Sequence, residues 1–316
     1  MRKLIVTLIT ALLACGPALA WHETGHRATA AKAFDAMDAG MRSRVTGILR
    51  AHPRFGDDFA GLMPARVAAG SDADQGKWLL EQASIWPDLI QTLGDDVRRE
   101  YNRSRWHYIN LPVWLTDADR VALQSTLGHN VDTVFAPPLR QNLNIVQALR
   151  GNLAVWHDDA ASDAEKAVAL CWIVHLAGDL HQPLHTVALF SRAYFPEGDR
   201  GGNSIAVAWG KDTRNLHAVW DGLPTGMDDL DPTPRTLRSI AEDVVDDAAI
   251  DDWLYQHASL ARKFVYTEDL KRQLLDRLAG DEPPVVTLSH EYLVAARSIA
   301  RRQINLTGSR IPGLLR

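Results

Sequence analysis

The segment from His175 to His185 constrains the fold of this chain more than any other stretch. It reads His-Leu-Ala-Gly-Asp-Leu-His-Gln-Pro-Leu-His, so His175 and Asp179 are four residues apart. On a helix this spacing places both side chains on one face, where they can reach one ion. Pro183 must then interrupt or bend the helix, which turns His185 in a different direction. The segment therefore predicts a helix, a bend and a cluster of ligating side chains.

A second pair with the same spacing lies further along the chain. His217 and Asp221 occur in Asn-Leu-His-Ala-Val-Trp-Asp. Imidazole and carboxylate are the ligands that zinc accepts where thiolates are absent. Two such pairs, with His185 between them, indicate more than one metal ion.

Helical periodicity dominates the chain from end to end. Apolar residues recur at three- and four-residue spacing in the segments 28–37, 138–155, 163–180, 236–258 and 289–305. Asp163, followed by Ala-Glu-Lys and an apolar run, predicts a helix N-cap. Strand-like alternation is short, and it is clearest from Ser204 to Trp209. The fold class that these patterns predict is all-α.

Clusters of glycine and proline predict the main loops. They occur at 51–64, 196–202 and 223–234, and none is long enough for a linker between domains. With 316 residues and ample core, the chain is therefore expected to form a single mainly helical domain over residues 21–316.

The first twenty residues have the composition of a signal peptide. Arg2 and Lys3 precede an apolar stretch from Leu4 to Cys15, and Ala18-Leu19-Ala20 is a small-residue cleavage site. The apolar stretch is too short to span a bilayer comfortably. We expect residues 1–20 to be removed and the protein to be exported by a bacterium, to the periplasm or out of the cell. An alternative interpretation is lipid attachment at Cys15.

Charge and cysteine content narrow the function further. Loss of Arg2 and Lys3 would change the formal charge from −5 to −7, and an acidic protein does not attract polyanions by its overall charge. A nucleic-acid partner would therefore need the local charge of metal ions. Cys171 would remain as a single cysteine, which excludes an intrachain disulfide. An exported protein without disulfides needs stability from its core or from metals.

Three further motifs complete a pattern with the two spaced pairs. Trp-His-Glu-Thr-Gly-His occupies 21–26, Ser-Ile-Trp-Pro-Asp occupies 84–88, and Arg-Trp-His-Tyr-Ile-Asn occupies 105–110. In this order the motifs resemble the zinc-dependent single-strand-specific nucleases of fungi, plants and bacteria, such as the fungal nucleases S1 and P1. That family shares a helical fold and a three-zinc site with bacterial phospholipase C, and the resemblance covers essentially the whole of residues 21–316.

The resemblance implies three Zn²⁺ ions. The first would be held by Asp88, His107, His175 and Asp179. The second would be held by the α-amino and carbonyl groups of Trp21, by His26 and by Asp179 as a bridge. The third would be held by His185, His217 and Asp221. These ligands are nitrogen and oxygen only, and open coordination positions would remain for water and substrate, as catalytic zinc requires.

The implied activity is hydrolysis of single-stranded DNA and RNA to products with 5′-phosphates, with possible 3′-nucleotidase activity. Asp88 would orient the attacking water or accept its proton. Tyr108 follows His107 and would stack on a base, and Asn203 would hydrogen-bond the base. Asn110 stands where the fungal enzymes have aspartate, so the base preference would differ or broaden.

Gln91 is a second departure from the fungal pattern. Fungal members have an arginine at this place, three residues after the aspartate, where it contacts phosphate. An amide in its place puts phosphate affinity and 3′-nucleotidase efficiency in doubt.

Two other functions compete with the nuclease. A phospholipase C would need apolar surface near the site, for which the segment 190–195 with Tyr194 is the candidate. Gly201-Gly202-Asn203 and the pair Tyr108 and Asn110 favour the nuclease instead. A zinc-storage protein would need closed coordination or flexible histidine-rich tracts, whereas the ligands here are dispersed.

The remaining expectations concern partners and the other histidines. The partners expected are single-stranded nucleic acid and nucleotides as substrates, with a monomeric protein that does not associate stably with membranes. His181 points away from the face of His175 and Asp179, which favours a packing role. His22, His52 and His129 have no partner at ligand spacing, and we expect them to be surface or capping residues.

Overall fold

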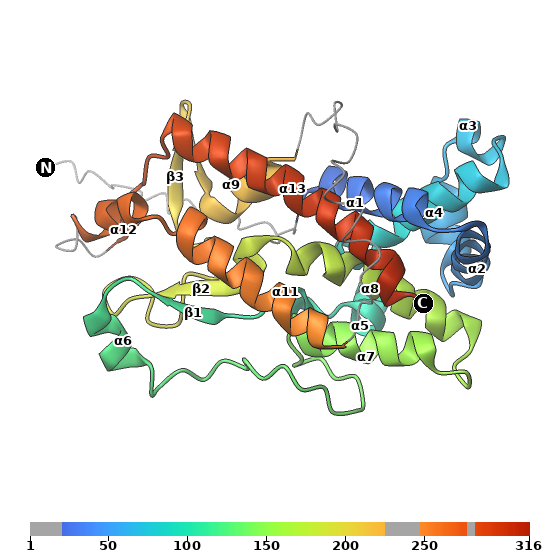
Figure 1. Cartoon of the computed structure of the whole chain (residues 1–316), viewed down its shortest axis with the longest axis horizontal. Helices are drawn as coiled ribbons and strands as arrows, with labels where there is room; N and C mark the ends of the chain where they lie inside the picture. Colours follow the sequence, from blue (N-terminus) through green and yellow to red (C-terminus); the bar gives the residue numbers. More distant parts are fainter. Residues whose placement is uncertain (1–20, 225–246, 277–281) are drawn as a thin grey trace, which may run out of the picture.

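The computed structural model describes residues 21–224, 247–276 and 282–316. The expected signal peptide, residues 1–20, and most of the expected loop 223–234 lie outside the described residues. The described chain is mainly helical, as predicted (Figure 1). Its α-helices are α1 (Glu23–Ala36), α2 (Ala39–Arg50), α3 (Ala65–Ala68), α4 (Asp72–Leu89), α5 (Asp95–Tyr101), α6 (Asp117–Leu123), α7 (Ile145–His157), α8 (Asp163–Leu180), α9 (Leu216–Gly222), α11 (Asp247–Leu260), α12 (Glu268–Leu275) and α13 (His290–Leu314).

Helix α8 forms the centre of the molecule. Almost every side chain from Ala167 to Leu180 is buried, which is the pattern of a helix covered on all faces. It packs against α7, α4 and α2, and α1 and α13 lie across it (Figure 1). The predicted bounds of this helix and its interruption before Pro183 are both confirmed, because α8 ends at Leu180 and a short 3₁₀ turn follows at Pro183–His185.

The N-caps of α8 and α7 differ from the predictions. The cap of α8 is Ser162 rather than Asp163, because the Ser162 side chain accepts a hydrogen bond from the Glu165 amide in a reciprocal capping box. Helix α7 begins at Ile145 rather than at Pro138. Here the Asn144 side chain accepts from two amides of the first turn, which fixes the start seven residues later.

The bounds of other helices and of one loop also differ from those predicted. Helix α1 begins at Glu23 and so includes His26, whereas the periodic segment begins at residue 28. Helix α13 continues to Leu314 instead of ending at residue 305. Of the expected helix 236–258, the described part is α11. The expected loop 51–64 is partly wrong, because it contains a π-helical turn at Phe55–Phe59 and a 3₁₀ turn at Ala60–Leu62.

Helices α1 and α13 lie side by side, and α4 packs on another face of α1 (Figure 1). Helices α1 and α13 approach each other closely at Gly308 on α13. A Cβ atom there would lie 2.6 Å from the Lys32 Cβ and 3.0 Å from the Thr29 carbonyl oxygen of α1, so a side chain would force the helices apart. Within the described residues no helix combines the length and the apolar character needed to cross a membrane.

Two short strand pairs join the helices to the site. Strands β1 (Leu111–Trp114) and β2 (Val187–Phe190) pair in parallel, and the ladder is extended where Ile109 donates to the His185 carbonyl oxygen (2.8 Å). Strands β3 (Ala206–Trp209) and β4 (Asp212–Asn215) pair antiparallel, and β3 confirms the predicted strand. The parallel pair holds the segments that end at His107 and His185 next to each other.

Candidate functional site

The structure brings eight of the expected ligand side chains together. They come from α1, α4, α8, α9 and the 3₁₀ turns at Ser104–His107 and Pro183–His185. They form three groups, and in each group the ligating atoms lie within 4.8 Å of one another. The groups are His26 with His175 and Asp179, Asp88 with His107 and His175, and His185 with His217 and Asp221.

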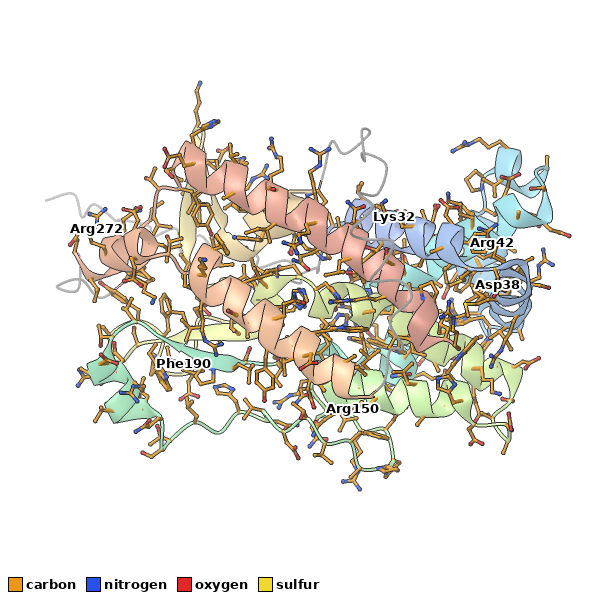
Figure 2. All side chains as sticks on the ribbon, viewed as in Figure 1. Lys32, Asp38, Arg42, Arg150, Phe190 and Arg272 are labelled. Carbon is orange, nitrogen blue, oxygen red and sulfur yellow. The ribbon has the colours of Figure 1, made fainter. Side chains whose placement is uncertain are left out.

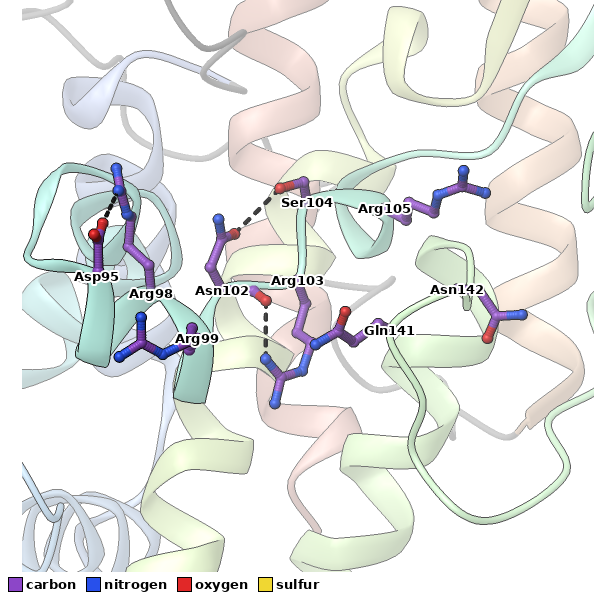
Figure 3. Close-up of a pocket in the computed structure, with 9 residues that line it drawn as sticks. All are labelled: Asp95, Arg98, Arg99, Asn102, Arg103, Ser104, Arg105, Gln141 and Asn142. Carbon is purple, nitrogen blue, oxygen red and sulfur yellow. Dashed lines mark hydrogen bonds and ion pairs between the residues drawn. The ribbon is translucent and has the colours of Figure 1, made fainter.

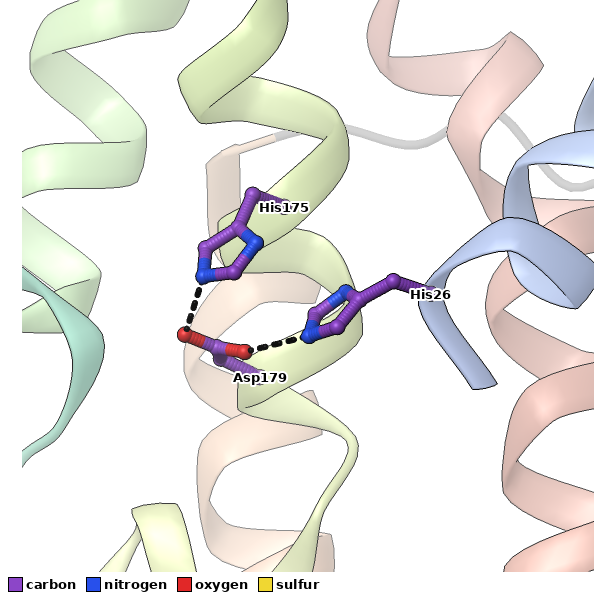
Figure 4. A group of neighbouring side chains, drawn as sticks. All are labelled: His26, His175 and Asp179. Carbon is purple, nitrogen blue, oxygen red and sulfur yellow. Dashed lines mark ion pairs between the residues drawn. The ribbon is translucent and has the colours of Figure 1, made fainter. Parts of the chain in front are cut away.

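Asp179 joins the first two groups. Its Oδ1 lies 3.2 Å from His26 Nε2, and its Oδ2 lies 3.2 Å from His175 Nε2 (Figure 4). Oδ2 also lies 3.1 Å from His107 Nδ1. The two carboxylate oxygens therefore face different sides of the cluster, an arrangement in which one carboxylate can bridge two cations.

Asp88 and Asp221 complete the second and third groups. Asp88 Oδ1 lies 3.8 Å from His107 Nδ1 and accepts a hydrogen bond from the Gln91 amide (3.1 Å). Asp221 Oδ2 lies 3.4 Å from His217 Nε2, and its Oδ1 accepts from the Gln182 amide (2.8 Å). Each carboxylate is thus oriented by a glutamine side chain, as ligating carboxylates commonly are by a neighbouring donor.

The histidine tautomers show which nitrogens are available as ligands. His175, His185 and His217 each place Nδ1 against a backbone carbonyl oxygen, at 2.8, 2.6 and 2.6 Å respectively. A carbonyl only accepts, so each Nδ1 carries a proton, which leaves Nε2 as the nitrogen that can ligate a metal ion. In all three rings this nitrogen points into the cluster.

These nitrogens face other ring nitrogens. The Nε2 atoms of His185 and His217 are 3.1 Å apart, and His175 Nε2 is 2.9 Å from His107 Nδ1. Two facing ring nitrogens repel through their lone pairs unless a proton or a metal ion lies between them. Two nitrogens on one tetrahedral zinc are about 3.3 Å apart, given Zn–N bonds of about 2.0–2.1 Å. The donor set and its spacing therefore fit zinc.

The pKa shifts of the buried site residues also indicate a cation, most clearly in the group of His185, His217 and Asp221. Burial lowers the pKa of His217 to about 3 and raises the pKa of Asp221 well above its ordinary value. A buried carboxyl without a charged partner stays neutral, so ionised Asp221 needs a cation beside it. At His175 burial also acts to lower the pKa, but the carboxylates of Asp179 and Asp88 raise it to about 9.

Two glycines allow the site to close. A Cβ at Gly178 would lie 2.8 Å from His26 Nδ1, so glycine lets His26 lie against α8, where its ring stacks on His175 at 4.3 Å. Gly201 has φ +61°, and a Cβ there would lie 2.5 Å from the Leu184 carbonyl oxygen. The carbonyl oxygen of Gly201 is the group that orients His217.

A pocket of about 320 Å³ opens beside the cluster. His107, His185 and His217 line it, and so do all three expected base-binding residues, Tyr108, Asn110 and Asn203. Tyr108 is 41% exposed, which leaves its ring accessible to a ligand. The other lining residues are Gln91, Ser104, Leu184, Arg200 and Gly201.

Sequence reasoning did not identify the groups that position the ligands. Gln182, Gly178 and the Ser84 carbonyl oxygen each hold or admit a ligand side chain. Gln182 and Gly178 could have been suspected, because they lie inside the histidine-rich segment. The role of the Ser84 carbonyl depends on the packing of α4 against α8, which no local pattern encodes.

Trp21 lies at the start of the described chain, and two histidines outside the three groups have packing or capping positions. The Trp21 side chain is fully buried, and the amide of His22 donates to the Asp221 carbonyl oxygen (3.2 Å), which ties the start of the described chain to α9. His181 is buried away from the three groups, as expected. His52 was expected to be a surface or capping residue; it is buried against Phe59 and Trp86, and its Nδ1 accepts from the Arg54 amide (3.1 Å), which is a capping contact.

Comparison with known proteins agrees with this geometry. A family model described as S1/P1 Nuclease matches residues 21–316. Endonuclease 4 of Arabidopsis thaliana is 46% identical over 189 residues, 58% of this chain and 54% of the relative. Endonuclease 5 of the same plant is 28% identical over 169 residues, 51% and 46%. Nuclease S1 of Aspergillus oryzae is 38% identical over 63 residues, 20% and 19%.

The chain spans about half the length of the first curated relatives it matches. The family model, in contrast, extends over every described residue, including all three ligand groups. With a histidine and aspartate cluster suited to zinc and a match of this extent, the chain belongs to the S1/P1 nuclease family.

Proposed function

We propose that the protein is a zinc-dependent endonuclease that hydrolyses single-stranded DNA and RNA and leaves 5′-phosphate ends. The observation that carries this proposal is that three of the ligand histidines, His107, His185 and His217, line one pocket together with the three base-binding candidates. The family match and the endonuclease relatives support it.

Three zinc ions are proposed, one for each ligand group. Asp88, His107, His175 and Asp179 would hold one ion, His26 and the bridging Asp179 a second, and His185, His217 and Asp221 the third. The α-amino and carbonyl groups of Trp21 would complete the group that contains His26. Bound zinc lowers the pKa of a water molecule and polarises phosphate oxygens, which is the chemistry that phosphodiester hydrolysis needs.

The chain's own residues have distinct tasks in this reaction. Asp88 has a side chain that is 13% exposed, so it can contact the attacking water and hold or accept its proton. The Gln91 amide orients Asp88, and this amide occupies the place of the fungal arginine, so the charge beside the phosphate is reduced.

The far side of the pocket would bind the base. Tyr108 would stack on a base, which contributes about 1–3 kcal/mol and is possible only where the base is unstacked from its neighbours. The Asn203 amide donates to the Arg200 carbonyl oxygen (2.9 Å), so its Oδ1 remains available to accept from a base. Together these groups favour single strands over duplexes.

The phospholipase alternative has less support in the structure. Its candidate apolar segment, 190–195, begins and ends with buried phenylalanines, because Phe190 and Phe195 are 0% and 3% exposed. Tyr194 is only half-buried. Most of the apolar surface of this segment therefore belongs to the core and does not form a membrane-facing patch.

One assay separates these functions. The zinc-loaded protein is offered single-stranded DNA, RNA, a 3′-nucleotide and phosphatidylcholine, and the products are identified by chromatography. We expect oligonucleotides with 5′-phosphates, together with slower release of phosphate from the 3′-nucleotide. Release of phosphocholine without any nucleotide product would overturn the proposal.

Export and maturation belong to the same proposal. Removal of residues 1–20 in the periplasm or outside the cell would free the Trp21 amine, which can bind zinc when it is deprotonated. We expect protein that begins at Trp21 to bind three zinc ions and protein that retains Ala20 to bind two. Elemental analysis of both forms checks this, and three zinc ions in the longer form would contradict it.

A further inference from the structure

Four arginines lie within the eight residues from Arg98 to Arg105, in a chain whose formal net charge is −5. The structure gathers them around a second pocket of about 930 Å³ (Figure 3). This basic groove is lined by Arg98, Arg99, Arg103 and Arg105, together with Asp95, Asn102, Ser104, Gln141 and Asn142. Asp95 is the one carboxylate among these lining residues, so the groove has an excess of positive charge.

Arg103 and Arg105 form no ion pair with a carboxylate among the residues that the structure describes. The Arg103 guanidinium donates to the carbonyl oxygens of Asn102 (2.9 Å) and Glu100 (2.6 Å) and lies over the Trp106 ring, which fixes its position. The exposed Arg105 forms no hydrogen bond or ion pair with any residue that the structure describes. Both charges therefore remain available to an anion.

Arg98 and Arg99 are held more weakly. Each forms an exposed ion pair three residues back along α5, with Asp95 and Asp96 respectively. Such surface pairs contribute little to stability, and an arginine has five N–H donors, so it can bind a phosphate while it keeps or exchanges its partner. The amides of Gln141 and Asn142 line the opposite side of the groove (Figure 3).

The groove adjoins the candidate active site. Ser104 lines both pockets. The 3₁₀ turn that begins at Ser104 ends at the ligand His107, and Arg105 lies between them. The groove is therefore placed where the nucleotides next to a bound one would pass.

We propose that the basic groove binds the phosphate backbone of the nucleotides that flank the cleaved bond in a single-stranded substrate. This inference rests on the proposed function. Arginine forks match phosphate geometry, and a positively charged channel that tracks the backbone is the general means of binding single strands without reading their sequence. The groove supplies the attraction for polyanions that the overall charge of the protein does not.

The test compares long and short substrates. In the triple variant Arg98→Ala, Arg99→Ala and Arg105→Ala, the KM for a strand of about twenty nucleotides should rise about tenfold or more. For single strands each lost phosphate contact lowers the log–log salt slope by about 0.7, so the slope should fall by about 2. Cleavage of a dinucleotide, which is too short to reach the groove, should keep its kcat/KM within about twofold.

Arg272→Ala is the matched control. Arg272 forms the same kind of exposed ion pair, with Asp269 three residues earlier. It lies on α12 at the far left of Figure 2, whereas α5 lies right of centre in the same view of Figure 1. This variant should leave both the KM for the long strand and the salt slope unchanged.

Failure of the groove and failure of the nuclease proposal give different results. If the unaltered protein cleaves neither substrate, the proposed function is wrong, and fluorescence anisotropy of a labelled strand still tests the groove without turnover. If the triple variant binds and cleaves the long strand as well as the unaltered protein does, the proposal that the groove binds phosphates is wrong. An equal loss on long and short substrates would overturn it too, because the substitutions would then act on the active site.

Discussion

Two pairs of buried histidines show what separates a candidate ligand from a core residue. His185 and His217 face each other in the site, and His181 and His257 face each other under α13, with ring centroids 4.9 and 4.5 Å apart. In both pairs every Nδ1 lies against a backbone carbonyl oxygen. The two pairs therefore do not differ in burial or in the hydrogen bond that each Nδ1 makes.

The difference lies at Nε2. In the core pair, His181 Nε2 accepts from Arg310 (2.8 Å), and His257 Nε2 lies 2.7 Å from the Oε1 position of Gln303, whose amide can turn its NH₂ group to donate there. In the site pair the two Nε2 atoms face each other at 3.1 Å. A buried polar atom without a protein partner needs another one, so unsatisfied lone pairs distinguish a metal site from a packed histidine pair better than burial does.

The largest effect is expected where one carboxylate contacts three imidazoles. Asp179→Asn removes the charge shared by His26, His107 and His175, and phosphodiester hydrolysis should fall by at least about 10³-fold. Zinc content, measured by elemental analysis after dialysis, should fall as well. Full zinc content together with full activity would remove Asp179 from the centre of the site.

A substitution in the core pair should lower the stability of the protein and leave its zinc content unchanged. His257→Ala leaves a cavity and an unpaired Gln303 amide, so the free energy of unfolding should fall by about 2–4 kcal/mol. Denaturant unfolding of the zinc-loaded protein measures this loss, and elemental analysis should show unchanged zinc. A loss of zinc would mean that the two pairs are not distinct in function.

A smaller effect on metal binding is expected at Gln182. Its amide donates to Asp221, and Gln182→Ala should weaken the affinity of the third group for zinc by about 10–100-fold. Competition with a chelator gives the affinity. Gln124→Ala, which alters an exposed amide after α6, provides the control.

The last effect is a dependence of stability on pH, which is small near neutral pH and grows as the pH falls. Burial lowers the pKa of His257 to about 4 in the folded protein, against about 6.5 in an unfolded chain. As the pH falls from 6.5 to 4, the unfolded chain binds the proton first, so stability declines by up to about 1.4 kcal/mol per pH unit. The variant His257→Gln should lose less stability than the unaltered protein over this range in urea titrations at each pH. If the free energy of unfolding falls equally with pH in both proteins, His257 does not contribute to the pH dependence.

The sequence was sufficient for the features that depend on local spacing. Four-residue spacing identified His175 with Asp179 and His217 with Asp221, and Pro183 indicated the bend after α8. The structure brings all eight expected ligand side chains into three groups, although their binding of metal stays a prediction.

Features that depend on distant contacts could not be read in this way. His52 is buried because Phe59 and Trp86 cover it, and these residues come from a turn read as a loop and from α4. The start of α7 was misplaced because the apolar periodicity extends back to Pro138, whereas the capping box of Asn144 sets the start in the fold. The arginines of the groove are evident in the sequence, but their position beside the site follows only from the turn that carries His107.

The close contact at Gly308 has a consequence for the order of folding. Helix α1, which carries His26, packs against α13, so the two ends of the described chain must meet before α1 is fully covered. Contacts between such distant segments form slowly and late. The ligand group that contains His26 is therefore expected to be completed late in folding, when α1 docks, and not when α8 forms.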